Sequence, residues 1–133
     1  MNETVIKSLA TNGQVYNIKI KYPNSPPWWI EVTNTLIPHA RFNGSDLFDC
    51  LIKLRSELDK LNIKLLCNGS RIDAHPSRMS RDMGGARKVY LLKIGQQGRL
   101  EDLVDIFDEA SADKVSTVEE QNIYYRNWIK SLG

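Results

Sequence analysis

The sequence has few of the residues that bind metal ions or form disulfides. It contains two cysteines and two histidines, and no Cys-x-x-Cys or His-x-x-x-His pair gives them the spacing of zinc ligands. Two thiols in a chain without an export signal are more typical of buried small apolar residues than of a disulfide. We therefore expect no metal ion, no other cofactor and no disulfide.

Long hydrophobic runs are also missing. No run approaches the roughly 18 residues of a membrane span, and the N-terminus lacks the basic segment and apolar stretch of a signal peptide. The 133 residues are 41% hydrophobic and 26% charged, which is typical of one globular domain. The sequence thus predicts a single cytoplasmic domain over residues 1–133 that does not contact a membrane.

Basic residues are almost missing from residues 100–120. Residues 1–99 hold 15 Lys and Arg against 8 Asp and Glu, whereas residues 100–120, here called the acidic segment, hold 1 against 8. One interpretation is a solvated loop that leads into the N-terminus of a helix. The other is an electrostatic docking face for a basic partner.

Alternation of apolar and polar residues predicts the strands. Tyr16, Ile18, Ile20 and Tyr22 alternate with polar residues, as in a sheet with one solvent-facing side. The preceding Asn12-Gly13 is typical of a tight hairpin turn. The same reasoning predicts strands over residues 4–10, 16–22, 28–33, 36–42, 63–67, 87–94 and 103–107, the last at a sheet edge.

Two segments have helical patterns. Leucines 47, 51, 54, 58 and 61 share one helical face, which predicts a helix over residues 45–61 with Ser45 as its N-cap. A capping box formed by Thr117 and Glu120, or one residue earlier by Ser116 and Glu119, predicts a helix over residues 117–131. The expected fold is a single α+β domain with an antiparallel or mixed sheet covered by these two main helices.

Residues 76–85 end in two glycines and predict a single helical turn or an ordered loop, because glycine readily adopts the left-handed conformation that stops a helix. Met79 and Met83 are one turn apart. We expect them to fill the core beneath this segment rather than to form an adaptable contact surface. We expect Arg81 to pair with the adjacent Asp82 and to fix the loop.

Asp73, His75 and Ser77 invite comparison with a catalytic triad. Residues two apart in an extended chain lie about 6.5 Å from each other, whereas a nucleophile and its base need hydrogen-bond contact. No nucleophile elbow or oxyanion loop accompanies these three residues. We therefore predict that the protein is not an enzyme, and a small enzyme that uses His75 is only the third hypothesis.

Residues 71–93, here called the arginine-rich segment, carry more basic than acidic residues around a glycine pair. Their glycines match neither a phosphate loop nor a dinucleotide fingerprint, and the basic excess is modest for a nucleic-acid footprint. Binding of nucleic acid or nucleotide therefore stays the alternative function. The residues that form this alternative binding or structural motif are Arg71, Asp73, His75, Ser77, Arg81 and Asp82.

Four motifs carry a family resemblance: Gly44-x-Asp46-Leu47-Phe48, Leu54-Arg55-x-Glu57-Leu58, Cys67-Asn68-Gly69-x-Arg71 and Ser77-x-Met79-x-Arg81-Asp82-Met83-Gly84. In these motifs, over about residues 42–107, the chain resembles small bacterial cytoplasmic proteins that include immunity proteins of contact-dependent growth inhibition. The resemblance implies a protein that neutralises the C-terminal toxin domain delivered by a neighbouring cell, often by covering a nuclease active site. It implies no chemistry by the chain itself.

The function predicted from the sequence is therefore that of an immunity protein whose partner is a cognate toxin C-terminal domain. Inhibitors of basic nucleases are commonly acidic, whereas this chain has a pI near 8.5, so nucleic-acid mimicry is expected to be local at most. We do not expect nucleic acid to be the main partner. For docking to a cationic nuclease, the candidate residues are Asp105, Asp108, Glu109 and Asp113.

Overall fold

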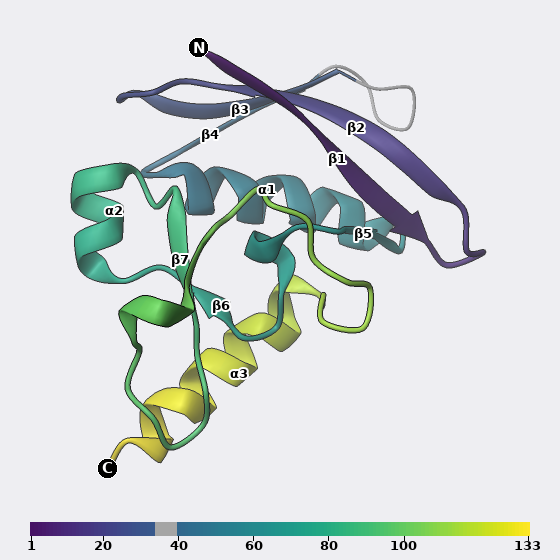
Figure 1. Cartoon of the computed structure of the whole chain (residues 1–133). Helices are drawn as coiled ribbons and strands as arrows, with labels where there is room; N and C mark the ends of the chain where they lie inside the picture. Colours follow the sequence, from purple (N-terminus) through teal and green to yellow (C-terminus); the bar gives the residue numbers. More distant parts are fainter. Residues whose placement is uncertain (34–39) are drawn as a thin grey trace.

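The computed structural model describes residues 1–33 and 40–133, which form one α+β domain with two antiparallel sheets and three α-helices (Figure 1). The α+β prediction is confirmed, but the prediction of two main helices is incomplete because a third helix is present. Every strand pairing in both sheets is antiparallel. In the described part of the chain, no helix is both long enough and apolar enough to cross a membrane.

The larger sheet has the strand order β4-β3-β2-β1-β5. Its strands are β1 (Asn2–Ala10), β2 (Val15–Tyr22), β3 (Trp28–Thr33), β4 (Ala40–Gly44) and β5 (Ile63–Leu65). The β1–β2 hairpin turns at Gly13, whose φ of 87° suits glycine. The fourth strand, predicted over residues 36–42, is observed as β4; residues 36–39 lie outside the described part of the chain.

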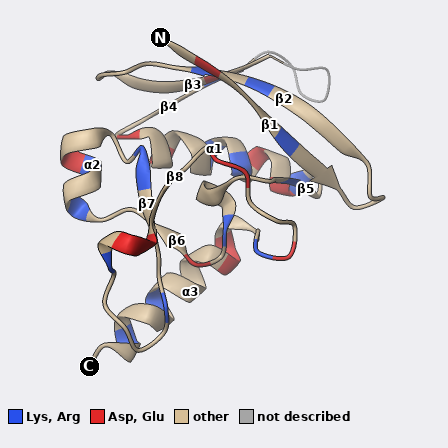
Figure 2. Ribbon diagram, in the orientation of Figure 1, with Lys and Arg blue, Asp and Glu red and all other residues tan. Residues whose placement is uncertain are grey.

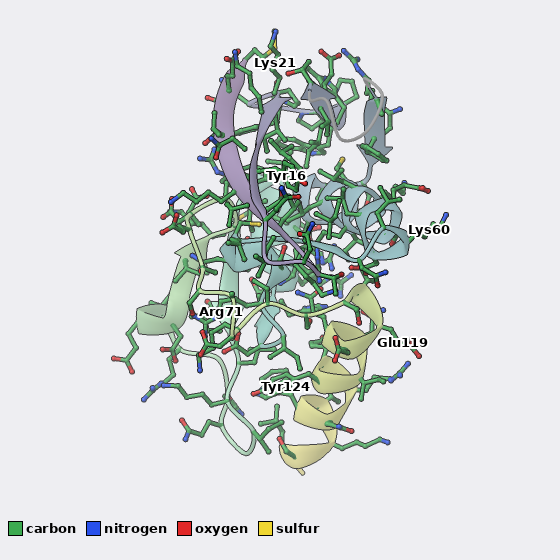
Figure 3. The ribbon with its side chains drawn as sticks, turned by 90° about the vertical axis from the view of Figure 1, so that its right-hand side faces the viewer. Tyr16, Lys21, Lys60, Arg71, Glu119 and Tyr124 are labelled. Carbon is green, nitrogen blue, oxygen red and sulfur yellow. The ribbon has the colours of Figure 1, made fainter. Side chains whose placement is uncertain are left out.

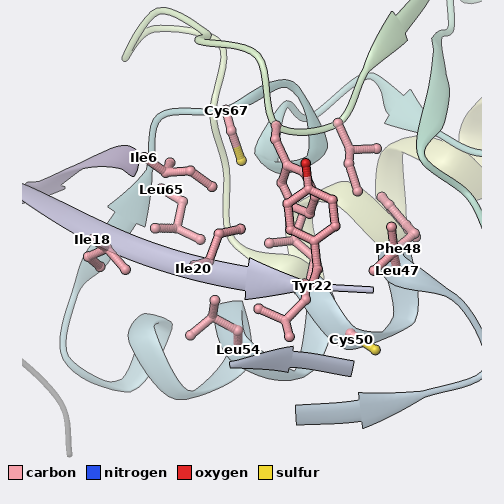
Figure 4. Packing of buried hydrophobic residues seen from close by; sticks show 14 of the residues in the cluster. Ile6, Ile18, Ile20, Tyr22, Leu47, Phe48, Cys50, Leu54, Leu65 and Cys67 are labelled. Atoms are coloured by element: carbon pink, nitrogen blue, oxygen red, sulfur yellow. The ribbon is translucent and has the colours of Figure 1, made fainter. Parts of the chain in front are cut away.

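The helix α1 (Leu47–Lys60) crosses the inner face of this sheet. Its leucine face is confirmed by the full burial of Leu51, Leu54 and Leu58, which pack with sheet residues such as Ile18 and Ile20 (Figure 4). Leu61, the fifth leucine of the pattern, is 52% exposed because the helix ends before it.

The predicted N-cap of α1 is wrong by one residue. Asp46, not Ser45, caps the helix: its carboxylate accepts a hydrogen bond from the Asp49 amide at 2.7 Å. The Ser45 amide instead donates to the Asp49 carboxylate at 2.9 Å. Ser45 therefore lies outside the helix, as the partner of an acidic residue in the first turn.

The smaller sheet has the order β6-β7-β8, with β6 (Ala74–His75), β7 (Lys88–Leu91) and β8 (Leu103–Asp105). β8 lies at the edge, as predicted. Between β6 and β7 the chain forms the helix α2 (Arg78–Gly84), where a single turn or loop was predicted. Gly85 ends α2 with a φ of 63°, and a Cβ there would lie 2.3 Å from the Trp28 ring, so only glycine fits.

The last helix, α3 (Val118–Ser131), lies on the side of α1 that faces away from the larger sheet (Figure 1). The predicted capping box is confirmed in the register of Thr117 and Glu120. Two short 3₁₀ helices, η1 (Asn68–Ser70) and η2 (Leu100–Asp102), complete the fold. Both cysteines are buried free thiols, and burial raises the pKa of Cys50 to about 12.

Candidate functional site

The first and fourth resemblance motifs join at the start of α1. The Arg81 guanidinium lies 2.6 Å from the carboxylate of Asp46, and the Leu47 amide donates to the Gly85 carbonyl at 2.7 Å. The predicted pairing of Arg81 with Asp82 is wrong, because Asp82 is exposed while Asp46 is nearly buried beside α2. These motif residues thus tie α2 to α1.

The second and third motifs join inside the molecule. Arg55 is 2% exposed and donates to the Gly69 carbonyl, the Ser116 carbonyl and the Gln121 side chain at 2.7–3.2 Å. Burial lowers the pKa of this guanidinium, and no carboxylate lies within ion-pair distance among the described residues. The buried role of Arg55 was not predicted from the sequence, although its place between Leu54 and Leu58 on the leucine face was an available signal.

Arg71 and Asp73, both in the arginine-rich segment, form a bidentate ion pair with N–O distances of 2.9 and 2.8 Å. Hydrogen bonding to Asp73 raises the pKa of Arg71, with a smaller contribution from the charge of Asp113. Arg71 is also bridged through its backbone to Val115. The structure therefore brings predicted residues of the arginine-rich and acidic segments together at one place.

The acidic residues of the acidic segment are marked in red on the ribbon in Figure 2. Backbone hydrogen bonds and ion pairs attach this segment to the rest of the protein. Four of its eight acidic residues form ion pairs with other described residues, with N–O distances of 3.0–3.7 Å. These pairs are Glu101–Arg99, Asp102–Lys93, Asp105–Arg87 and Glu109–Lys7. The excess of acid in residues 100–120 thus compensates basic residues elsewhere in the fold.

Among the four candidate docking residues, Asp105 differs from the other three. Its side chain is 15% exposed, pairs with Arg87 at 3.0 Å and accepts from the Phe107 amide at 2.9 Å. Asp108, Glu109 and Asp113 are exposed. Asp105 is therefore built into the fold, whereas the other three carboxylates can reach a partner.

Asp73, His75 and Ser77 have separate partners. Asp73 binds Arg71, Ser77 caps α2 by accepting from the Ser80 amide at 3.0 Å, and the His75 Nδ1 atom lies 2.9 Å from the Pro76 carbonyl. No hydrogen bond joins any two of these three side chains in the described structure. These three side chains therefore do not form the hydrogen-bonded proton relay of a catalytic triad.

His75 belongs instead to an aromatic stack. Its ring lies 3.5 Å from the Tyr125 ring with an interplanar angle of 6°, and the Phe48 ring meets it edge-on at 5.7 Å. The pKa of His75 falls from 6.5 to about 4, mainly because the ring is buried and to a smaller extent because of the charge of Arg81. The imidazole is therefore neutral at neutral pH, and the short contact to the Pro76 carbonyl places its proton on Nδ1.

A pocket of about 300 Å³ opens beside this stack and is here called the aromatic pocket. Its walls come from β6, the two residues after it and the start of α2, from β7 and the following loop, and from α3. They include His75, Arg78, Tyr90, Gly98, Tyr125 and Trp128. The indole N–H of Trp128 donates to the Gln96 carbonyl at 2.7 Å, which fixes one wall.

Beside the aromatic pocket, α2 exposes its methionines. The prediction that Met79 and Met83 fill the core is wrong: they are 71% and 83% exposed, and no residue of α2 is buried. The helix is held by the Asp46–Arg81 pair, by the Ser80 hydroxyl, which donates to the Lys88 carbonyl at 2.6 Å, and by the contacts at its ends. These contacts are polar, and the methionine side chains face solvent. Arg78, also exposed, makes no ion pair or hydrogen bond with the described residues.

A search of the described residues finds no group of three or more His, Cys, Asp or Glu side chains that could hold a metal ion. No protein-family model matches the chain, and no curated protein matches its sequence. The resemblance to immunity proteins therefore stays a prediction that rests on the four motifs.

Proposed function

We propose that this protein binds and neutralises another protein, as the immunity protein of a contact-dependent growth inhibition toxin. The observation that carries the proposal is the methionine pair, Met79 and Met83, on a helix that buries none of its residues. Methionine side chains are flexible and polarizable, and contact surfaces use them because they adapt to a partner. Two exposed methionines keep apolar surface in contact with water, and burial of that surface against a partner is favourable.

The proposed docking surface is the exposed side of α2, which includes the first residue of the helix, Arg78. Arg78 and Met79 are adjacent in sequence and both are exposed, so one contact can combine apolar burial with a charged hydrogen bond. Arg81 is engaged with Asp46 and belongs to the support of this surface rather than to its contact layer.

The acidic segment supplies a second, electrostatic contribution. Asp108, Glu109 and Asp113 are exposed and steer a cationic partner towards the complex, whereas Asp105 stays in its pair with Arg87. To contact a partner, Glu109 must give up its ion pair with Lys7. Both side chains of this pair are exposed, so its loss costs little free energy. The proposed role needs no chemical step by this chain.

The proposal predicts that a reading frame beside the gene encodes a large exported protein, and the test uses the purified protein together with the C-terminal domain of that exported protein. The proposal predicts a stoichiometric complex by calorimetry and loss of the toxin's activity in the same mixture. If the two proteins form no complex at micromolar concentrations, the proposed function is wrong. If they form a complex that leaves the toxin active, the protein binds the toxin without conferring immunity, and the proposal is equally wrong.

A further inference from the structure

We propose that the aromatic pocket binds a planar nitrogen heterocycle that carries an anionic group, the chemistry of a nucleoside monophosphate. The pocket lies between β6, the start of α2, β7 and α3, and it shares Arg78 with the proposed docking surface, but the methionine pair is not among its walls. Nucleotide binding can therefore be tested in the absence of any partner protein, whether or not the immunity function holds. The described pocket residues provide three things that such a ligand needs: aromatic walls, open hydrogen-bond positions and a free cation.

The walls suit a flat ring. His75 and Tyr125 stack on each other at 3.5 Å, so the sides that they turn towards each other are closed to a ligand. A bound ring would pack against the ring surfaces that remain open to the pocket, including that of Trp128, which lies 5.9 Å from Tyr125 at an angle of 21°. Proteins recognise unpaired bases by stacking them on aromatic side chains. The indole of Trp128 is already held by Gln96, so little conformational freedom is left to lose when a ring packs against it.

The hydrogen-bond positions suit a ring with N–H groups. Because Nδ1 of His75 faces the Pro76 carbonyl, its Nε2 atom is an acceptor, and it has no partner among the described residues. The hydroxyl groups of Tyr90 and Tyr125 also lack hydrogen-bond partners among the described residues. An exocyclic amine of a base can donate to the imidazole while a ring nitrogen or carbonyl accepts from a tyrosine.

The charge suits a phosphate. Arg78 lines the pocket, is exposed and makes no ion pair with the described residues. A guanidinium binds phosphate through two parallel hydrogen bonds. No acidic side chain is among the pocket walls, so nothing there opposes an anion.

The size limits the ligand to one small ring system. The volume of about 300 Å³ is at the lower end for ligand pockets. Space is left because residue 98 is glycine: a Cβ at this position would lie 3.3 Å from the Tyr90 ring. A larger side chain at Gly98 would crowd Tyr90 and the buried Leu92, which both line the pocket, and would reduce the space for a ligand.

The test is a titration of the full chain with AMP, GMP, CMP and UMP, followed by NMR at the Trp128 indole N–H and by calorimetry. The indole signal is assigned with Trp128→Phe. We expect at least one nucleotide to shift the signal saturably, and ribose 5-phosphate, which lacks the base, to bind at least about tenfold more weakly. A tenfold change in the dissociation constant is about what the loss of one favourable contact between ligand and protein produces.

Two variants examine the pocket, and a third is the matched control. Arg78→Gln should weaken nucleotide binding about tenfold, and Gly98→Val should abolish it. Lys21→Gln removes the same charge from the far end of the molecule, and it should leave affinity unchanged (Figure 3). Melting temperatures show that each variant is folded; if Gly98→Val does not fold, Arg78→Gln still decides the result.

A short 5′-phosphorylated single-stranded RNA distinguishes the two sources of this chemistry. Binding much tighter than that of the free nucleotide, with steep salt dependence, assigns the pocket to an RNA end; equal binding assigns it to the free nucleotide. The inference is wrong if no nucleotide shifts the Trp128 signal at millimolar concentration. It is also wrong if Arg78→Gln and Lys21→Gln weaken binding equally, or if the signal responds only to a partner protein.

Discussion

The acidic segment and the α2 region differ in how completely the fold uses their side chains. In the acidic segment, four carboxylates pair with basic residues of the chain, and Glu120 closes the capping box of α3. In the α2 region, the methionine pair is exposed and Arg78 has no partner among the described residues. Most carboxylates of the acidic segment are therefore paired within the protein, although this segment is the most unusual part of the sequence. The methionines and Arg78 of the α2 region, which is less unusual in sequence, are free to contact a partner.

This difference teaches that a run of charge in a sequence does not measure the charge offered to a partner. Backbone hydrogen bonds hold the acidic segment against the chain, as from the Ala110 amide to the Leu66 carbonyl and from Ser116 to Ser70. Once the segment lies there, its carboxylates meet lysines and arginines that are distant in sequence. The following predictions test this contrast, from the largest expected effect to the smallest.

Arg55→Ala should cause the largest loss of stability, about 3 kcal/mol or more. The substitution leaves the Ser116 carbonyl and the Gln121 side-chain oxygen without their buried donor, and leaves the Gly69 carbonyl with only the bond from Gln121 Nε2. It also removes one of the two hydrogen bonds that hold the backbone of Ser116, near the end of the acidic segment, and leaves the bond from the Ser116 amide to the Ser70 carbonyl. Urea denaturation measures the change in the free energy of unfolding.

Lys60→Ala, at the exposed end of the same helix, is the control and should change stability by no more than about 0.5 kcal/mol. If both variants lose equally little, Arg55 does not anchor the acidic segment.

Asp105→Ala should destabilise the protein by about 1–3 kcal/mol, because it removes a half-buried pair with Arg87 and a bond to the Phe107 amide. Asp108→Ala, three residues further along, removes an exposed carboxylate and should change stability by less than about 0.5 kcal/mol. Equal losses, measured by urea denaturation, would mean that the acidic segment does not divide into structural and available carboxylates.

His75 should make stability fall between about pH 6.5 and pH 4. Its pKa is about 4 in the folded protein and near 6.5 when unfolded, so only the unfolded state takes up a proton in this range. Above about pH 6.5 both states are neutral and the effect is absent. His75→Phe keeps an aromatic ring against Tyr125 but cannot titrate, so its melting temperature should fall less on acidification than that of the wild type. Parallel pH curves for the two proteins would contradict this account of the stack.

Local patterns predicted most of the secondary structure because they depend on neighbours in sequence. The leucine face of α1, the Thr117 cap and the Asn12-Gly13 turn follow from periodicity, capping and backbone preference. The N-cap of α1 was displaced by one residue because Asp46 also meets Arg81, a contact across the fold that local capping rules do not contain.

The candidate site was less predictable because it depends on which distant residues meet. Methionines at helical spacing usually fill a core, but α2 is held by polar contacts, and Met79 and Met83 remain outside. The aromatic pocket joins His75 to Tyr125 and Trp128 from the other end of the chain. No local spacing rule places those rings together.

Exchange of both exposed methionines should have the smallest effect on stability. Met79→Ser with Met83→Ser removes side chains that are 71% and 83% exposed, so the free energy of unfolding should change by less than about 1 kcal/mol. A larger loss in urea denaturation would show that these side chains support the fold, which would remove them as free contact residues.

The most direct test of the account compares this double variant with Asp108→Asn/Asp113→Asn in binding to the neighbouring toxin domain, at two salt concentrations. The methionine variant should lose at least about tenfold in affinity at both concentrations, since apolar contacts are insensitive to salt. The acidic variant should mainly slow association, and only at low salt. If the methionine variant binds like the wild type while the acidic variant loses most of its affinity, the docking surface is the acidic segment and the account is contradicted.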